Sequence, residues 1–130
     1  MKIIKDIEKL IKNLKPTLQS EKYFIITYKD YLPSAIGLFK EEEGMTFFIE
    51  EKYIRKINIE EKSGPYALIS LKVYSDLKAV GLIAKLTKVL AEKNISVNII
   101  SAYFHDHLFI PWKRKEEALV ILKKLSNSYM

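Results

Sequence analysis

The stretch "FHDH", residues 104–107, gathers three titratable side chains, His105, Asp106 and His107. It holds both histidines of the chain and one of its four aspartates. Residues two apart on an extended strand share a face, so both imidazoles could bind one metal ion. With no cysteine and no third histidine, the remaining ligands would have to be carboxylates or come from a second chain. The sequence therefore predicts surface histidines near a turn and no metal site.

The same three residues do not predict catalysis. A histidine beside an aspartate needs a nucleophile or a substrate pocket, and adjacency in sequence supplies neither. The absence of cysteine excludes disulfides, thiolate catalysis and cysteine-bound zinc or iron–sulfur clusters. We therefore expect no catalytic residue, no cofactor and no enzymatic activity.

The elements that would position these residues follow from apolar periodicity and breakers. In the first half the pattern predicts a helix with lysines opposite its apolar face, two strands, an irregular linker between them, and a polar segment that ends in Ser-Gly-Pro. The helix is expected at 3–15, the strands at 23–28 and 46–54, the linker at 29–45 and the polar segment at 55–65. The Ser-Gly-Pro breaker is the best candidate for an internal boundary, so we predict two parts, 1–62 and 63–130.

The second half reads as strand, helix, strand, tight turn, strand, helix. The expected ranges are 66–74, 75–94, 95–104, 107–112 and 113–127. This order is most of a ferredoxin-like unit, an α+β fold with an antiparallel sheet and its helices on one face. The last strand of that unit is missing, and either the first half or a partner chain must supply it.

Four stretches in this order resemble an ACT domain, the small amino-acid-sensing βαββαβ module. They are "SGPYALISLKV", "SDLKAVGLIAKLTKVLAEKNISV", "IISAYFHDHLFIP" and "KEEALVILKKL". They look most like the two-module branch that includes uncharacterised prokaryotic proteins and the animal cytosolic arginine sensor. Residues 17–54 resemble the shortened first module of that branch. Ala102 replaces the family's hairpin threonine, and His107 stands where an aromatic is usual.

The resemblance implies a non-catalytic regulatory protein that binds an amino acid or related ligand through the 76–81 loop and the 101–106 hairpin. The implied ligand-binding residues are Asp76, Leu77, Gly81, Leu82, Ser101 and Asp106. Other roles stay open for several of them. Asp76 could cap the helix, Gly81 could allow close packing, Ser101 could be a polar strand residue, and Asp106 could serve the hairpin turn.

The charge composition indicates which classes of partner the protein could bind. The net charge of +6 comes from 22 cations, of which 20 are lysines interleaved with 12 glutamates, a composition resembling thermophile surfaces. Only Arg55 and Arg114 offer a guanidinium, and no strand carries the RNA-recognition pattern, so nucleic-acid binding is the weaker alternative. A dimeric interaction protein without a ligand is another. The resemblance implies a homodimer, since such modules generally pair across a two-fold axis. We expect the protein in the cytoplasm, because no apolar run approaches the ~18 residues of a membrane helix and no signal peptide is evident.

Overall fold

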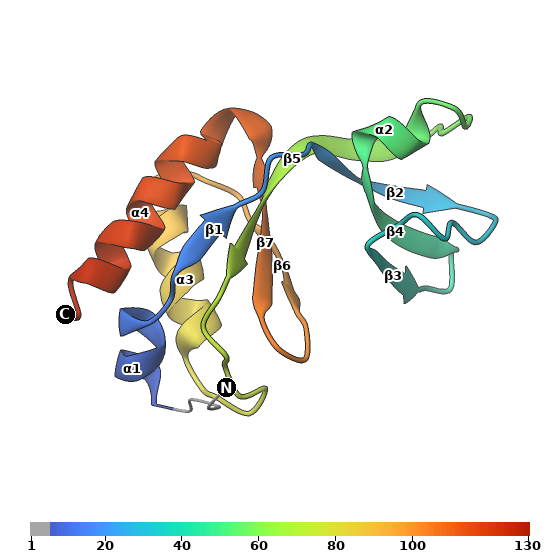
Figure 1. Cartoon of the computed structure of the whole chain (residues 1–130). Coiled ribbons are helices and arrows are strands. Elements are labelled where there is room, and N and C mark those ends of the chain that lie inside the picture. The colour runs from blue at the N-terminus through green and yellow to red at the C-terminus, as the bar shows by residue number, and fades with distance from the viewer. Residues whose placement is uncertain (1–5) are drawn as a thin grey trace.

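The computed structural model describes residues 6–130, so the first residues of the predicted 3–15 helix lie outside the described part. The described chain forms seven strands, four α-helices and one short 3₁₀ helix (Figure 1). The strands are β1 (Pro16–Leu18), β2 (Tyr23–Tyr28), β3 (Gly37–Lys40), β4 (Met45–Glu50), β5 (Lys62–Leu71), β6 (Asn98–Ser101) and β7 (Asp106–Pro111). The helices are α1 (Ile7–Lys12), α2 (Glu51–Ile54), α3 (Leu82–Ala91), η1 (Trp112–Arg114) and α4 (Lys115–Asn127).

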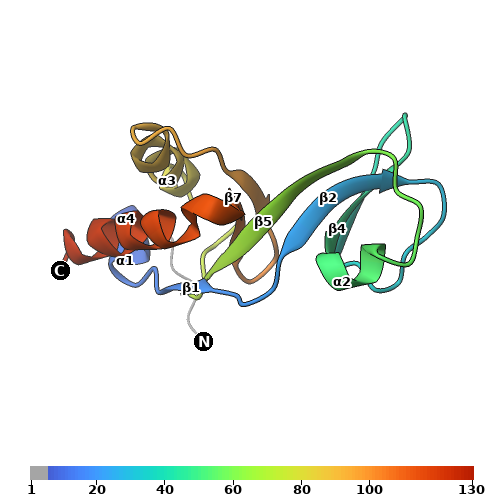
Figure 2. The ribbon, with the colours of Figure 1, turned by 90° about the horizontal axis from the view of Figure 1, so that it is seen from above.

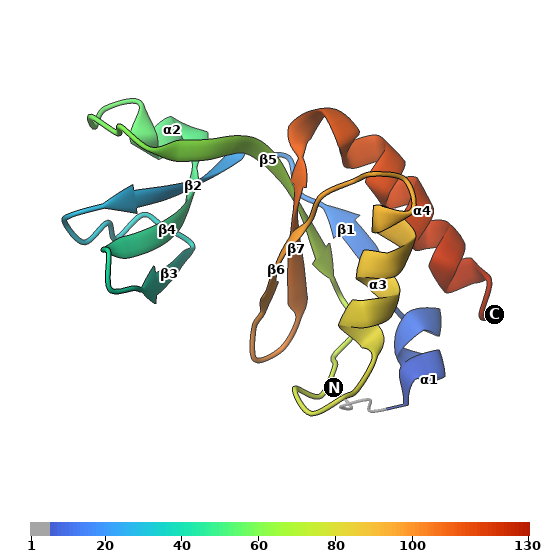
Figure 3. The same ribbon diagram turned by 180° about the vertical axis from the view of Figure 1, so that it is seen from behind.

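The strands form one antiparallel sheet in the order β3-β4-β2-β5-β7-β6, with β1 pairing beside β5. In the second half, β1-β5-β7-β6 is the strand order of a ferredoxin-like unit, and α1, α3 and α4 cover one face (Figures 1 and 3). The α+β ferredoxin-like prediction is confirmed. Among the described residues before 62, the helices are α1 and the short α2, and the link between β2 and β3 has no helix.

The first half of the chain supplies the strand that the second half lacks. Thr17 of β1 pairs with Ser70 of β5, on the edge opposite β7. The residues before it are part of the same core, because Leu10, Ile11 and Leu14 are fully buried in one cluster with the apolar faces of α3 and α4. The segment from α1 to β1 thus packs with the second half, although it is far from it in sequence. The predicted division at residue 62 stays a prediction.

Strand β5 belongs to both halves and runs along most of the molecule (Figure 2). Its first residues pair with β2, and residues 66–70 pair with β7. The predicted Ser63-Gly64-Pro65 breaker lies inside this strand, so no loop separates the halves there. The pairing register with β2 shifts at this point, as in a β-bulge, which is where a strand tolerates proline.

Three apolar clusters hold the sheet. The largest lies under α1, α3 and α4, and a second fills the first half around Phe24, Phe47 and Ile49. The third lies between them and is aromatic: Phe109 of β7 stacks on Phe48 of β4, with ring centroids 5.5 Å apart, and meets Tyr23 edge-on. Because β4 and β7 are separated by two strands in the sheet, this contact requires the sheet to curl.

Several predicted ranges needed correction. The linker 29–45 contains strand β3, and the predicted 46–54 strand ends at Glu50 and continues as α2. The helix predicted for 75–94 is shorter, since α3 begins only at Leu82, where its apolar stripe begins, and residues 75–81 form a loop. The strands predicted at 95–104 and 107–112 are the shorter β6 and β7, and the final helix starts as the 3₁₀ turn η1. Asn94 has φ 55°, the left-handed conformation expected just after α3.

Candidate functional site

The structure brings all six predicted ligand-binding residues together. They line one small cavity of about 120 Å³ between the loop after β5, the start of α3 and the β6–β7 hairpin. The six are Asp76, Leu77, Gly81, Leu82, Ser101 and Asp106. They come from positions up to 30 residues apart in the sequence, so the fold of the second half creates this cavity.

Asp106 is the most deeply placed polar group of the cavity. It begins β7, its backbone pairs with Ser101 of β6, and only 6% of its surface is exposed. Ser75 donates a long hydrogen bond to its carboxylate, with an Oγ–Oδ2 distance of 3.4 Å. A buried carboxylate is costly unless it is well hydrogen-bonded or paired with a cation. A cationic group entering the cavity would therefore gain from Asp106.

The opposite wall is the N-terminus of α3. Gly81 is the N-cap residue and has no side chain to cap the first backbone N–H groups, those of Leu82, Ile83 and Ala84, which also line the cavity. The first N–H groups of a helix lack partners within the helix, and the helix dipole makes this end favourable for an anion. The cavity thus has the N-terminus of a helix on one side and a buried carboxylate on the other.

Backbone conformation and packing together explain why residue 81 is glycine. Its φ of 101° lies in the region that side chains with a Cβ rarely adopt. A Cβ there would also lie 3.0 Å from Cδ1 of Ile7 in α1. The N-terminal helix, which the family resemblance left unassigned, therefore packs directly against the rim of the cavity.

The other predicted residues differ in whether they take the alternative roles that the sequence left open. Asp76 does not cap α3; its carboxylate accepts a hydrogen bond of 2.7 Å from the backbone N–H of Lys78 and closes a turn within the loop. Ser101 is exposed at the end of β6. Leu77, which lines the cavity, is 60% exposed, and Val80 of the same loop is 87% exposed.

The two histidines do not share a site. His105 lies in the turn before β7, where its Nδ1 is 3.1 Å from the carbonyl oxygen of Val73. His107 lies in β7, with Nδ1 2.8 Å from the hydroxyl of Ser70. Burial lowers the pKa of His107, and the nearby His105 and Lys72 lower it further against the opposing effect of Asp106. Within residues 6–130, no group of three or more histidine, aspartate or glutamate side chains is arranged to hold a metal ion.

Sequence reasoning missed two polar roles. Ser75, in the segment predicted as the start of a helix, donates to the carboxylate of Asp106. Arg114 is the middle residue of the basic run "KRK" at 113–115, and its guanidinium donates to the carbonyls of Lys93 and Asn94 just after α3, and to Glu117. Only the location of "KRK" at the start of a helix, which is unfavourable for cations, hinted at such a role.

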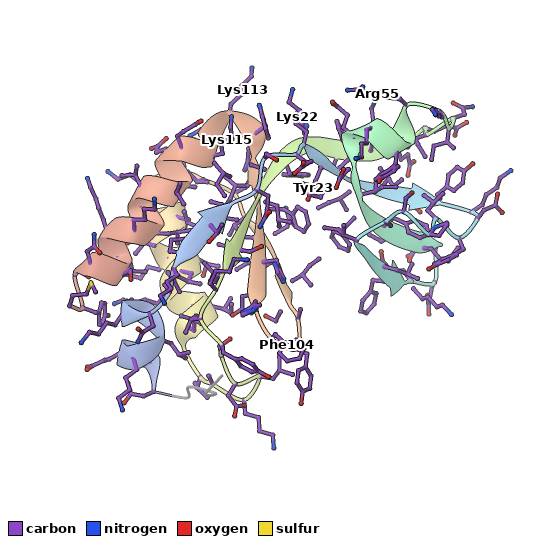
Figure 4. The ribbon with its side chains drawn as sticks, viewed as in Figure 1. Lys22, Tyr23, Arg55, Phe104, Lys113 and Lys115 are labelled. Carbon is purple, nitrogen blue, oxygen red and sulfur yellow. The ribbon has the colours of Figure 1, made fainter. Side chains whose placement is uncertain are left out.

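The first turn of α4 lies at the other end of the sheet from the candidate site. Figure 4 shows Phe104 at the tip of the β6–β7 hairpin, far from Lys113 and Lys115 at the start of α4. Trp112 is half-buried there, with the ammonium nitrogens of Lys115 and Lys22 3.9 and 5.1 Å from its ring centroid. Both ammonium groups lie over the ring of Trp112 in cation–π contacts, so this side chain has a structural role at the start of α4.

Two larger hollows lie away from the predicted residues. One, of about 490 Å³, lies at the end of β2 beside the β3–β4 turn and is lined mainly by polar side chains. The other, of about 680 Å³, lies between α3 and α4 and is mostly apolar. The described part of the chain has no helix long and apolar enough to cross a membrane.

The chain is similar to known proteins over most of its length. Two family models, both described as ACT domains, match residues 3–64 and 63–124. No curated protein matches. Among solved structures, the chain is similar to a protein of unknown function from Vibrio cholerae, described as a possible transport protein, at 33% identity, with a TM-score of 0.82 and 92% and 95% of the two chains covered.

Two further structures are similar in fold. One is a protein from Agrobacterium tumefaciens, 14% identical, with a TM-score of 0.70 and 88% and 90% of the chains covered. The other is the ligand-free regulatory subunit of aspartate kinase from Thermus thermophilus, 13% identical, with a TM-score of 0.62 and coverage of 87% and 97%. The strand order, the interlocked halves and the two family matches lead to one conclusion: the chain belongs to the ACT domain family.

Proposed function

We propose that this protein is a non-catalytic regulatory protein that binds a small amino acid or a related zwitterion in the cavity between the start of α3 and the β6–β7 hairpin. We further propose that it acts as a homodimer. The observation that carries the first proposal is the placement of two opposite charges in one cavity. The carboxylate of Asp106 forms one side, and the uncapped, positively polarised start of α3 forms the other.

These two groups match the two charges that every free amino acid carries. The ammonium group would replace the long hydrogen bond between Ser75 and Asp106 with a charge-assisted contact, which is shorter and stronger. The carboxylate would accept from the backbone N–H groups of Ile83 and Ala84. Each end of such a ligand then satisfies a group that the protein leaves poorly satisfied.

The size of the cavity supports a small ligand. Sites for drug-sized molecules occupy about 300–1,000 Å³, while this cavity has about 120 Å³. A nucleotide would not fit without a large rearrangement. Both guanidinium groups of the chain are engaged, Arg55 with Glu51 and Arg114 with Glu117, which also disfavours nucleic-acid binding. The fold is shared with a regulatory subunit of aspartate kinase, which supports a regulatory role.

A thermal-shift panel of the twenty amino acids tests the proposal. A ligand at 100 times its Kd should stabilise the protein by about 2.7 kcal/mol. Asp106→Asn keeps the shape of the side chain but removes its charge, and should abolish the response. Asp30→Asn, an exposed aspartate in the loop after β2, is the matched control and should respond like the wild type. If no amino acid stabilises the wild type, the proposal is wrong.

A second candidate function is a protein-interaction module that binds no ligand. It is favoured by exposed apolar side chains in the 76–81 loop and in the turn between β6 and β7, since Leu77, Val80, Tyr103 and Phe104 are all more than half exposed. Exposed apolar patches of this kind commonly mark interaction sites. This function would be favoured if no amino acid stabilised the protein and the protein bound a partner through the β6–β7 hairpin.

A further inference from the structure

The outer surface of α3 and α4 carries an apolar groove that the family assignment does not explain. Val89 of α3 and Ile121 and Leu125 of α4 contribute its apolar lining. Val120 lines the same groove and is 49% exposed, an unusual position for valine on a helix that has its own buried face. The groove has a volume of about 680 Å³, several times that of the candidate ligand cavity.

An acidic and a basic residue lie at equal distances on either side of Val120 along α4. Glu116, Val120 and Lys124 are four residues apart and all line the groove, so they form one stripe along the helix. Acidic residues at the start and basic residues at the end suit the dipole of a single helix. The dipole does not explain the exposed valine midway between them or the apolar groove beside it.

The charges of this stripe are complementary to those of a second copy that runs antiparallel to it. Eight residues of α-helix span about 12 Å, too far for Glu116 and Lys124 of one chain to form an ion pair. In a two-fold dimer each patch meets the same patch of the other subunit. A two-fold axis at Val120 with antiparallel α4 helices would place Glu116 opposite the partner's Lys124, twice. The two Val120 side chains would then meet at the axis, between the apolar grooves of the two subunits.

Glu116 is available for such a contact. Its side chain is 74% exposed and reaches Lys115 of its own helix only at 3.7 Å, and exposed pairs of this kind contribute little. We propose that the groove between α3 and α4 is the interface with a second copy of this chain, paired antiparallel through α4 about Val120. This inference rests on the homodimer proposed above and assigns its surface.

Sedimentation equilibrium over a concentration series tests the interface. The wild type should dimerise, and Val120→Glu should raise the dimer Kd at least about tenfold by placing a charge in the apolar groove. E116K and K124E should each do the same, because each creates like charges across the axis. The double variant E116K/K124E should restore the dimer to near the wild-type Kd. Lys113→Glu makes the same charge change outside the groove and should have little effect.

A wild type that stays monomeric, or a dimer that Val120→Glu leaves intact, would overturn the proposal. A double variant as weak as the single ones would overturn the antiparallel pairing. The amino-acid panel on the same variants keeps this test separate from the ligand proposal, since the groove and the cavity share no residue. A monomeric Val120→Glu protein with an intact amino-acid response would show that the interface and the ligand site act independently.

Discussion

Replacing Gly81 with alanine should destabilise the protein by about 1–3 kcal/mol. The left-handed backbone of residue 81 costs a residue with a Cβ about 1–2 kcal/mol. The contact of 3.0 Å with Ile7 would push that side chain off its rotamer, which costs about 0.5–1.5 kcal/mol. The more restricted unfolded chain offsets about 0.4–1 kcal/mol of this loss.

Urea denaturation of the wild type and Gly81→Ala measures the free energy of unfolding directly. For a chain of this size the loss corresponds to a fall in melting temperature of about 4 °C per kcal/mol. Because valine lacks the Cδ1 atom that the new Cβ would meet, Ile7→Val separates the two causes. In the Ile7→Val background, Gly81→Ala should cost less, and the difference measures the steric part.

Two results would refute this reasoning. If Gly81→Ala changed the free energy of unfolding by less than about 0.5 kcal/mol, residue 81 would not hold the positive φ that argues for glycine. If its cost were the same with isoleucine and valine at position 7, α1 would not pack against the rim of the cavity. Either outcome would change the shape assigned to the ligand site.

Three further predictions concern the elements around the site. Leu10→Ala should lower the free energy of unfolding in urea by about 2–5 kcal/mol, because this fully buried side chain joins α1 to the core of the second half. A loss below about 1 kcal/mol would contradict that packing. Arg114→Ala should lower stability by about 1 kcal/mol through lost contacts at the end of α3, and an unchanged melting temperature would contradict them. Because the pKa of His107 is lowered in the folded state, the unfolded chain takes up the proton first as the pH falls, so stability is lost below about pH 6.5. His107→Gln should reduce the loss of stability between about pH 7.5 and 5.5, and an identical loss in both proteins would argue against this origin.

The second half of the fold could be predicted from sequence because its elements are local. The apolar stripe from Leu82 to Leu90 and the alternation before it are properties of short windows, and their order specified a ferredoxin-like unit. Residues 75–81 were included in the helix because Asp76, ahead of the apolar run, is typical of a helix N-cap. They form a loop, and the N-cap residue is Gly81, so the capping signal there was misleading.

The origin of the last strand could not be predicted. Its pairing joins Pro16 to Leu71, a contact between distant parts of the chain that no local pattern encodes. Likewise, Ser63-Gly64-Pro65 looks like a break but forms a bulge in β5, because β2 and β7 hold the strand on both edges. The candidate site was predictable as a set of residues only through the family resemblance. The burial of Asp106 and its bond from Ser75 required the folded structure.

The central claim is that Asp106 receives the amino group of a small zwitterion whose carboxylate lies at the start of α3. Calorimetric titration of the best stabilising amino acid and its N-acetyl derivative into the wild type and Asp106→Asn tests it most directly. Each change alone should raise the Kd at least about tenfold, as expected when a charge-assisted contact is lost. Acetylation should then cost Asp106→Asn little more, because both changes remove the same contact. An unchanged Kd for Asp106→Asn would contradict the account.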